Sequence, residues 1–214
     1  MAGGVARTVA KYMRRPYDGV PSPGWRRFLA QHANEIWTCD LFTVRTIWFR
    51  TLYVFFVIDH GRREIVHARV TAHPTAQWLA QQMVEACDRD RDPPRYLIHD
   101  RDGSYGAVFD KRVRCLGIRQ IRTPVRAPRA NAIAERWVRS VRAECLDPMY
   151  VFCHQHLQRS LNEYIAYYNR CRPHRSLDQR APCSPREQRI RRSSGRIVAE
   201  PVLGGLHHVY RFAA

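Results

Sequence analysis

Three acidic residues occur where a carboxylate is either costly or well placed for chemistry. Asp40 lies in the middle of the apolar stretch 37–44, where a charge without a partner is expensive. Asp100 directly follows the apolar run 96–99, and Glu135 lies on the helix after the next apolar segment. Carboxylates that converge without lysine partners repel one another unless a divalent cation neutralises them. Two such cations activate a nucleophile and stabilise a leaving oxygen at phosphorus, so the three acids predict metal-assisted chemistry on a phosphate ester.

Each acid has an ordinary explanation when it is taken alone. Asp40 fits a capped or salt-bridged acid of the core. Asp100 fits a turn residue, because the turn signal Asp102-Gly103 follows it. The combination of three acids, in the order of elements described below and in a strongly basic chain, favours a shared site.

The stretch 119–146 positions Glu135. It begins as a short strand, is interrupted by Pro124 and Pro128, and continues as one long helix. Asn131 lies near the helix start, where its amide is expected to accept from free backbone N–H groups. The buried face is predicted from apolar residues at helical spacing, which are Ile133, Trp137, Val138 and Val141.

A second face of this helix gathers polar residues at spacings of four, four and three, which are Asn131, Glu135, Arg139 and Arg142. One carboxylate and two arginines aimed in the same direction suit chemistry on a phosphate backbone. The alternative is a solvated face with an internal ion pair between Glu135 and Arg139. Taken alone, the helix favours that alternative.

The elements that would hold these residues follow a mixed pattern. Strands are predicted from apolar alternation and β-branched runs, at 37–44, 50–59, 64–70, 95–99 and 118–123. Helices are predicted at 25–33, from His73-Pro74 to Cys87, at 105–116 closed by Gly117, from Asn131 onward, and around 157–168. One or two weak strands are expected within 198–212.

The order β-β-β-α-β-α-β-α-α describes an α/β fold in which antiparallel hairpins are followed by parallel strands. In this topology the first and fourth strands are neighbours, so Asp40 and Asp100 can meet. Ligand sites of such sheets cluster where parallel strands end. The order is that of ribonuclease-H-like domains, so we expect a mixed five-stranded sheet flanked by helices, with a short helical N-terminal extension and an Arg/Pro-rich C-terminal extension.

The composition points to a polyanionic partner. The 214 residues carry a net charge of +17, spread along the chain, and every basic residue except Lys11 and Lys111 is arginine. Arginine suits bidentate phosphate contacts, so nucleic acid is the expected partner and a membrane is not. No signal peptide or long apolar run is present, and we expect a cytoplasmic, nucleoid-associated bacterial protein.

The seven cysteines do not form a recognisable framework. Cys39, Cys87, Cys115 and Cys145 lie in or beside apolar segments and are expected to be buried thiols of a reducing compartment. Two C-x-x-H pairs, Cys153/His156 and Cys171/His174, flank one predicted helix that would hold them roughly 20 Å apart. Zinc is therefore not expected.

Four ordered blocks resemble the integrase catalytic core shared by retroviral integrases and bacterial insertion-sequence transposases. They are Trp37-Thr-Cys-Asp40, His99-Asp-Arg-Asp-Gly-Ser-Tyr105, Pro128-Arg-Ala-Asn-Ala-Ile-Ala-Glu-Arg-Trp137, and Asn169-Arg-Cys-Arg-Pro-His-Arg-Ser-Leu177 followed by Pro182. The resemblance covers about residues 22–187. It implies a Mg²⁺-dependent (or Mn²⁺-dependent) transposase that cleaves DNA and transfers strands.

Carried over by position, the resemblance assigns Asp40 to both of two metal ions and gives Asp100 and Glu135 one ion each. It also implies DNA contacts, which we expect from Arg126, Arg129, Asn131, Arg139 and Arg142. Two departures occur: the spacing between Asp100 and Glu135 is one residue shorter than the family's usual one, and Asp102 stands where a glycine is usual. The alignment of Ser104-Tyr105 favours Asp100 as the catalytic acid.

The expected organisation has five parts, which are a remnant of a helix-turn-helix module at 1–15, a linker and short helix at 16–33, the catalytic core at 34–150, a helical extension at 151–187 and a basic tail at 188–214. The chain therefore resembles the catalytic part of a split or decayed transposase. We expect a homo-oligomer that acts on element ends and target DNA, and a separate helix-turn-helix subunit is a further expected partner.

Two alternative functions are retained. One is a catalytically inactive DNA-binding remnant that keeps the fold and the charge. The other is a ribonuclease-H-like nuclease that acts on RNA–DNA hybrids, although such enzymes usually carry a further acid near the third position.

Overall fold

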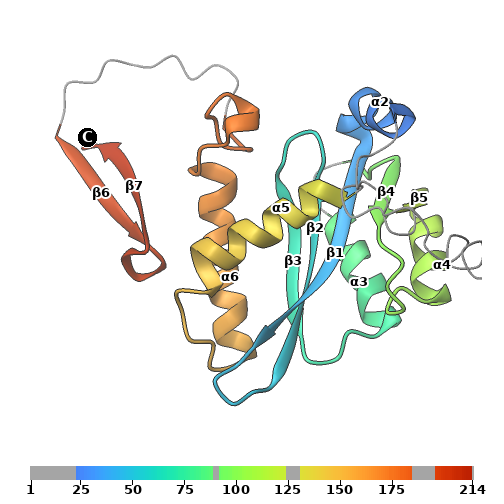
Figure 1. Ribbon diagram of the computed structural model, residues 1–214, viewed down its shortest axis with the longest axis horizontal. Helices are drawn as coiled ribbons and strands as arrows, with labels where there is room; N and C mark the ends of the chain where they lie inside the picture. The colour runs from blue at the N-terminus through green and yellow to red at the C-terminus, as the bar shows by residue number, and fades with distance from the viewer. Residues whose placement is uncertain (1–22, 89–91, 124–130, 185–195, 214) are drawn as a thin grey trace, which may run out of the picture.

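A five-stranded mixed sheet forms the centre of the protein (Figure 1). The computed structural model describes residues 23–88, 92–123, 131–184 and 196–213. The sheet order is β3-β2-β1-β4-β5. Its strands are β1 (Ile36–Arg45), β2 (Thr51–Asp59), β3 (Ile65–Thr71), β4 (Tyr96–His99) and β5 (Arg119–Arg122). The first three form an antiparallel meander, and β4 and β5 run parallel to β1, which confirms the predicted mixed sheet.

Helices cover both faces of the sheet (Figure 1). One face carries α3 (Ala76–Cys87) and α4 (Ala107–Cys115), and the other carries α5 (Ala132–Val141) and α6 (His154–Arg170). The N-terminal helix α2 (Pro23–Gln31) and the short turn η1 (Ala33–Glu35) lead into β1. Trp25, Phe28 and Leu29 of α2 pack on a small cluster at the start of β1 and β4, as their spacing predicts.

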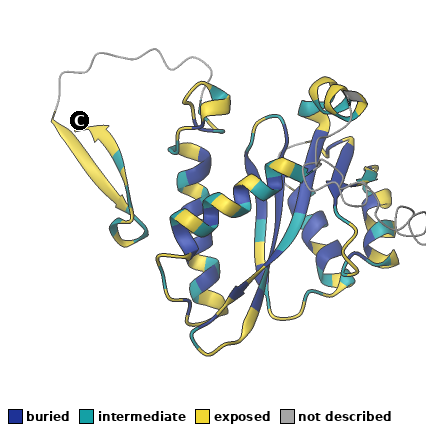
Figure 2. Cartoon of the chain, viewed as in Figure 1, coloured by how far each residue is buried: buried dark blue, intermediate teal, exposed yellow. Residues whose placement is uncertain are grey.

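Alternation along β1 divides its side chains between the two cores. Trp37 and Cys39 pack under α3 and α4, whereas Phe42 and Val44 pack under α5 and α6. The neighbouring β2 is buried on both faces over most of its length, which explains its continuous apolar run. Figure 2 shows this buried centre in the sheet and in the inner faces of the helices.

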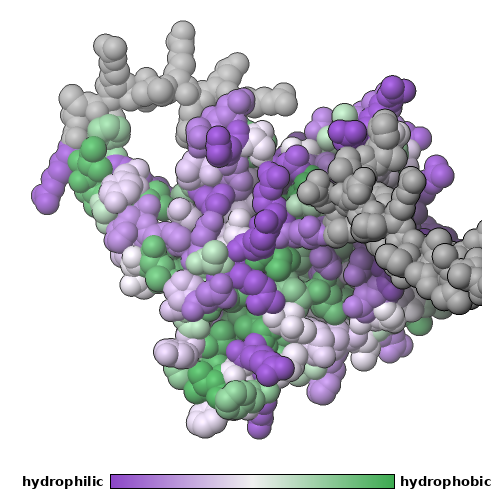
Figure 3. Space-filling model, in the orientation of Figure 1, coloured by the Kyte–Doolittle hydropathy of each residue, from purple (hydrophilic) through white to green (hydrophobic). Residues whose placement is uncertain are grey.

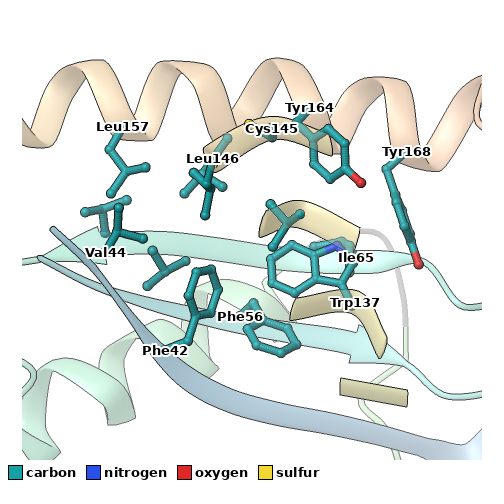
Figure 4. Packing of buried hydrophobic residues seen from close by; sticks show 14 of the residues in the cluster. Phe42, Val44, Phe56, Ile65, Trp137, Cys145, Leu146, Leu157, Tyr164 and Tyr168 are labelled. Atoms are coloured by element: carbon teal, nitrogen blue, oxygen red, sulfur yellow. The ribbon is translucent and has the colours of Figure 1, made fainter. Parts of the chain in front are cut away.

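Trp137 is the centre of the core beneath α5 (Figure 4). Its ring lies 4.1 Å from that of Phe56 and 5.8 Å from that of Phe42, measured between centroids. Leu157 and Tyr164 of α6 close the same cluster from above. Burying such rings stabilises the fold by roughly 1.5–3 kcal/mol each, so Trp137 holds α5 at a fixed height over β1 and β2.

Side chains of α6 cover the exposed edge of the sheet at β3. The Asn169 amide accepts from Ile65 N and donates to Ile65 O, both at 2.9 Å. Gln158 accepts from Val70 N at 2.9 Å, and His154 Nε2 donates to Val70 O at 2.8 Å. These groups take the place of a sixth strand and leave β3 a poor template for further pairing.

Two helix starts differ from the sequence prediction. The helix expected from His73-Pro74 begins at Ala76, because the Thr75 hydroxyl accepts from Trp78 N and caps it. Asn131 is at the N-cap position of α5, but its side chain makes no capping hydrogen bond, so that part of the prediction is wrong. Its φ of −112° and ψ of 32° are not the extended conformation usual at an N-cap.

The predicted single helix after Asn131 changes pitch near its end. α5 stops at Val141 and continues as a five-residue π-helical segment, η3 (Arg142–Leu146). The wider turn brings Cys145 and Leu146 into the core together, and the preceding residues keep their predicted faces: Trp137 and Val141 are buried, with Ile133 and Val138 packed at the margin.

Beyond α6, the short turns η4 (Arg175–Leu177) and η5 (Leu203–Gly205) frame a C-terminal hairpin of β6 (Ile197–Val202) and β7 (His207–Phe212). The hairpin confirms the two weak strands and lies beside α6, mostly exposed (Figure 2). His207 attaches it, since its ring stacks on Tyr167 and its Nε2 donates to Glu144 O. The proposed parts at 1–15 and the start of the tail at 188–195 lie outside the described residues.

The burial of the cysteines agrees only in part with the prediction. Cys39 and Cys145 are buried as predicted, but Cys87 is only partly buried and Cys115 is exposed, because it ends α4 on its solvent side. Within the described ranges, no helix combines the length and apolar character that crossing a membrane requires.

Candidate active site

Asp40 lies on the face of β1 that supports α5. It shares that face with Phe42 and Val44, because residues two apart on a strand point the same way. The side chain is half-buried, and its Oδ1 accepts from Leu41 N at 2.8 Å. One backbone donor therefore orients a carboxylate that the sheet has largely removed from water.

Asp100 follows the last residue of β4 at the same level of the sheet. The parallel register pairs Thr38 with Ile98, and two residues further along each strand are Asp40 and Asp100. The half-buried Asp100 carboxylate accepts from Asp102 N at 3.0 Å, while Asp102 itself is exposed and accepts from Ser104 N. The strand end therefore sets Asp100 beside β1, and the turn that follows leaves Asp102 more exposed.

Glu135 comes from the first turn of α5 and is half-buried. Its neighbours Ala134 and Trp137 are buried against the sheet, so the helix cannot rotate to carry Glu135 into solvent without losing that packing. Among the residues that the structure describes, no ion pair joins Glu135 to Arg139, so the paired solvated face considered above is not formed.

The pKa of Asp40 reflects both its burial and the acids around it. The pKa of Asp40 is raised to about 7, first by burial, which the hydrogen bond from Leu41 N opposes, and then by the charges of Asp100, Glu135 and Asp102. Like charges act this way only at short range. Burial is therefore the main cause of the raised pKa of Asp40, and the neighbouring acids add to it.

The carboxylates are not drawn together into a metal cage. In the described part of the chain, no group of three or more His, Cys, Asp or Glu side chains is close enough to hold an ion. The carboxylates of Asp40 on β1, of Asp100 directly after the adjacent β4, and of Glu135 on α5 nevertheless supply the oxygen donors that Mg²⁺ or Mn²⁺ prefers.

An open hollow of about 330 Å³ lies beside Asp100 at the ends of β4 and β5. Its wall includes Asp102 and the ion pair between Asp110 and Arg122. The hollow is polar and exposed to solvent on one side, which suits an extended charged ligand better than a small apolar molecule.

The predicted DNA-binding residues fall into three groups. Arg139 is exposed one turn beyond Glu135, with no hydrogen bond or ion pair to other described residues. Arg142 donates to Thr43 O at 2.9 Å and lies over the Phe42 ring, so β1 holds its guanidinium in place. Asn131 is half-exposed at the start of α5, and Arg126 and Arg129 lie outside the described residues.

His99 is a site residue that sequence reasoning missed. Its buried ring donates from Nδ1 to Asp100 O at 2.7 Å and packs between Tyr105 and Phe109. Burial lowers the pKa of His99, an effect that its hydrogen bonds to Asp100 O and Gln120 Oε1 oppose, and these bonds hold the turn that carries Asp100. The signal in the sequence was a polar residue ending an otherwise apolar strand.

The two C-x-x-H pairs lie at opposite ends of α6. Cys153 precedes the first residue of the helix and Cys171 follows the last one. His156 Nδ1 accepts from Phe152 N, and His174 packs its ring on Tyr168. Both histidines therefore have local structural partners.

Comparisons of the sequence place the chain beside mobile-element proteins. The family model for the integrase core domain matches residues 116–182. The transposase InsD of insertion element IS2A/D/F/H/I/K of Escherichia coli is 27% identical over 164 residues, covering 73% of this chain and 54% of the relative. The InsD protein of IS2E of E. coli K12 is 27% identical over 73% of this chain and 75% of its own length. The chain spans about half the length of most such relatives.

Comparisons of structure agree with the fold. A chain of the simian T-cell lymphotropic virus intasome, in complex with PP2A regulatory subunit B56 gamma, superposes with a TM-score of 0.61 and 14% identity, covering 83% of this chain and 66% of that one. The catalytic core domain of BIV integrase superposes with a TM-score of 0.53 and 14% identity, covering 70% and 91%. The predicted ribonuclease-H-like sheet is confirmed.

Proposed function

Because the chain carries an integrase/transposase catalytic core, we propose that it is a transposase that cleaves DNA at the ends of a mobile element and joins those ends to target DNA. The observation that supports the proposal is the parallel pairing of β1 with β4, which sets Asp40 on β1 beside Asp100 at the end of β4, together with the packing on β1 of α5, whose first turn carries Glu135. A chain with net charge +17 supplies the attraction to a phosphate backbone.

The three carboxylates would hold two Mg²⁺ ions, or Mn²⁺, with Asp40 shared between them and Asp100 and Glu135 completing one site each. When bound, such ions supply activation of the attacking hydroxyl or water and stabilise the leaving oxygen. The fit rests on Asp40, whose burial beside two like charges is unfavourable without a cation. Binding of a cation would remove that repulsion and draw the acids together.

The remaining site residues orient these acids and hold the substrate. Leu41 N and the His99 ring fix the two strand-borne acids. Arg139 is free to neutralise a phosphate beside Glu135, and Arg142 keeps further guanidinium donors while it is anchored on Thr43 O. DNA contacts from Asn131, and from Arg126 and Arg129 in the segment before α5, complete the proposed surface.

A matched pair of variants tests the assignment. Asp100→Asn and Asp102→Asn each remove one charge from the same turn, but only Asp100 is assigned to the metal. Labelled duplexes that copy the DNA flanking the coding sequence are incubated with the chain and Mg²⁺ or Mn²⁺, and cleavage and joining are followed on gels. Asp100→Asn is expected to lose both activities while still binding DNA, and Asp102→Asn is expected to keep them.

Two results would overturn parts of this proposal. Equal activity of Asp100→Asn and the parental chain would remove Asp100 from the site. DNA binding without cleavage or joining by the parental chain would favour the inactive DNA-binding remnant, and preferential degradation of an RNA–DNA hybrid would favour a ribonuclease-H-like nuclease.

A further inference from the structure

The turn between β1 and β2 exposes two large aromatic side chains. Trp48 is 70% exposed and Phe49 is 84% exposed. Phe49 also has a φ of 59°, a left-handed conformation that glycine or asparagine normally occupies in such turns. A bulky ring in a strained and solvent-exposed position stabilises neither the turn nor the core, which indicates a role in binding.

A second segment adds two more rings to the same surface. Ile47 N donates to Val151 O at 2.9 Å, which ties the turn to the connection that precedes α6. On either side of Val151, Tyr150 is 79% exposed and Phe152 is 54% exposed. We call Trp48, Phe49, Tyr150 and Phe152 the aromatic tip. Figure 3 shows hydrophobic residues gathered over this lower end of the molecule.

The charges around the aromatic tip favour a polyanion. The hairpin segment 41–58 contains no Asp or Glu, and its two charged residues, Arg45 and Arg50, are both exposed. Asp147 is an exposed acid on the neighbouring connection. A second copy of this chain docked tip to tip would bring these arginines together, which is unfavourable, whereas nucleic acid pairs with them.

The connection that carries Tyr150 and Phe152 is anchored on the same side of the sheet as the acids. Val151 belongs to the core under α5 and α6, on the face that carries Asp40. β1 continues five residues beyond Asp40 to Arg45, a length of roughly 17 Å. Arg142 is held on Thr43 O, which lies between Asp40 and Arg45 along β1. DNA lying over Glu135 and Arg142 would reach the tip after about five nucleotide steps.

We propose that the aromatic tip is a second DNA contact, which stacks on unpaired bases beside the strand that the three acids engage. The inference rests on the proposed transposase function and adds a binding site to it. Rings add little to phosphate contacts, but they bind the faces of unpaired bases strongly and without sequence preference. Guanidinium groups at Arg45 and Arg50 would hold the adjoining backbone.

The variant Trp48→Ser/Phe49→Gly removes both rings and suits the backbone, because glycine adopts the left-handed conformation of position 49 without strain. Tyr210→Ser is the matched control, since Tyr210 is 70% exposed on the C-terminal hairpin. Binding of the full chain is measured by fluorescence anisotropy with two probes, a blunt duplex and the same duplex with a single-stranded thymine tail.

The double variant is expected to bind the tailed duplex about tenfold more weakly and the blunt duplex with little change. Tyr210→Ser is expected to match the parental chain on both probes. Equal loss on both probes, or no loss on either, would overturn the stacking site. So would a variant whose DNA binding is unchanged while sedimentation shows lost self-association, because the tip would then be a protein interface.

These outcomes are separable from failure of the proposed function. A parental chain that binds the tailed duplex through the aromatic tip but joins no DNA ends would retain the stacking site and remove the transposase activity. A parental chain that binds neither probe would overturn both.

Discussion

The two ends of one helical run carry acids with opposite surroundings. Glu135, in the first turn of α5, makes no ion pair within the described part of the chain and lies on the helix that packs against β1, the strand of Asp40. Glu144, in the π-helical turn that follows α5, accepts from Arg172 Nε at 2.7 Å and from the Tyr164 hydroxyl at 2.9 Å. Both are half-buried, so burial alone does not separate a functional acid from a structural one.

The pKa shifts express the same difference. Burial alone would raise the pKa of Glu144, but the hydrogen bond and charge of Arg172, with the Tyr164 hydroxyl, lower it overall. The pKa of Asp40 is raised to about 7 by burial and by the neighbouring acids, and only Leu41 N opposes the shift. The fold therefore gives Glu144 a cationic partner and a hydroxyl donor, whereas the acids around Asp40 raise its pKa further.

The largest expected effect separates the two ends by activity. Glu135→Gln keeps the size and hydrogen-bonding capacity of the side chain but removes its charge. We expect it to reduce DNA joining by at least about a thousandfold, with the fold intact, because a metal ligand is lost. Glu144→Gln should leave the rate per folded molecule unchanged. Similar losses of joining in the two variants would contradict the assignment.

Stability should show the reverse order. Glu144→Gln leaves Arg172 without its ionic partner in a half-buried setting, and we expect a loss of about 2 kcal/mol in the free energy of unfolding. Glu135→Gln should change it by less than about 0.5 kcal/mol, because Glu135 makes no ion pair to lose. Urea denaturation of both variants measures the free energy of unfolding. A larger loss in Glu135→Gln than in Glu144→Gln would contradict the structural role given to Glu144.

The dependence of stability on pH should separate Asp40 from Glu144. Because folding raises the pKa of Asp40 from 3.8 to about 7, the folded state is favoured at low pH and loses stability as the pH rises through this window. Asp40→Asn should remove that slope and stabilise the metal-free protein at pH 8, on the order of 2 kcal/mol.

The contribution of Glu144 to stability depends on pH in the opposite direction. Its pKa is lowered in the fold, so its contribution is present above the ordinary value of 4.5 and is lost as the pH falls through the folded value. Urea denaturation without metal ions is measured at about pH 3, pH 5 and pH 8: the step from pH 5 to pH 8 reports Asp40, and the step from pH 5 to pH 3 includes the loss from Glu144. An unchanged slope in Asp40→Asn would show that Asp40 is not confined as described.

The smallest expected effect concerns Asn131. Since its side chain does not cap α5, Asn131→Ala should change the free energy of unfolding by less than about 0.5 kcal/mol. If Asn131 contacts DNA as proposed, the same variant should weaken binding of a blunt duplex severalfold. A loss of about 1 kcal/mol, typical when a capping side chain is removed, would show that Asn131 does cap α5.

Much of the fold follows from patterns that local physics controls. Alternation along β1 and the buried run of β2 predicted the sheet, and the order of elements placed Asp40 next to Asp100. Asp40 could be identified as a candidate because a charged side chain in an apolar strand is unfavourable unless it has a partner.

Features that depend on tertiary contacts did not follow from the sequence. The π-helical turn at Arg142 depends on packing Cys145 and Leu146 together. The contact of Arg142 with Thr43 O joins residues far apart in the chain, and no helical spacing encodes it. The helix predicted from His73-Pro74 begins later, at Ala76, because the Thr75 hydroxyl accepts from Trp78 N and so satisfies a free backbone donor.

The central claim, that Glu135 belongs to a metal site and Glu144 does not, is tested most directly by cation binding. Thermal unfolding is followed without Mg²⁺ and with about 10 mM Mg²⁺, a concentration that fills even a weak site enough to shift the melting temperature measurably. The account predicts that Mg²⁺ raises the melting temperature of the parental chain and of Glu144→Gln, and does not raise that of Glu135→Gln. An equal Mg²⁺ shift in all three proteins would contradict it.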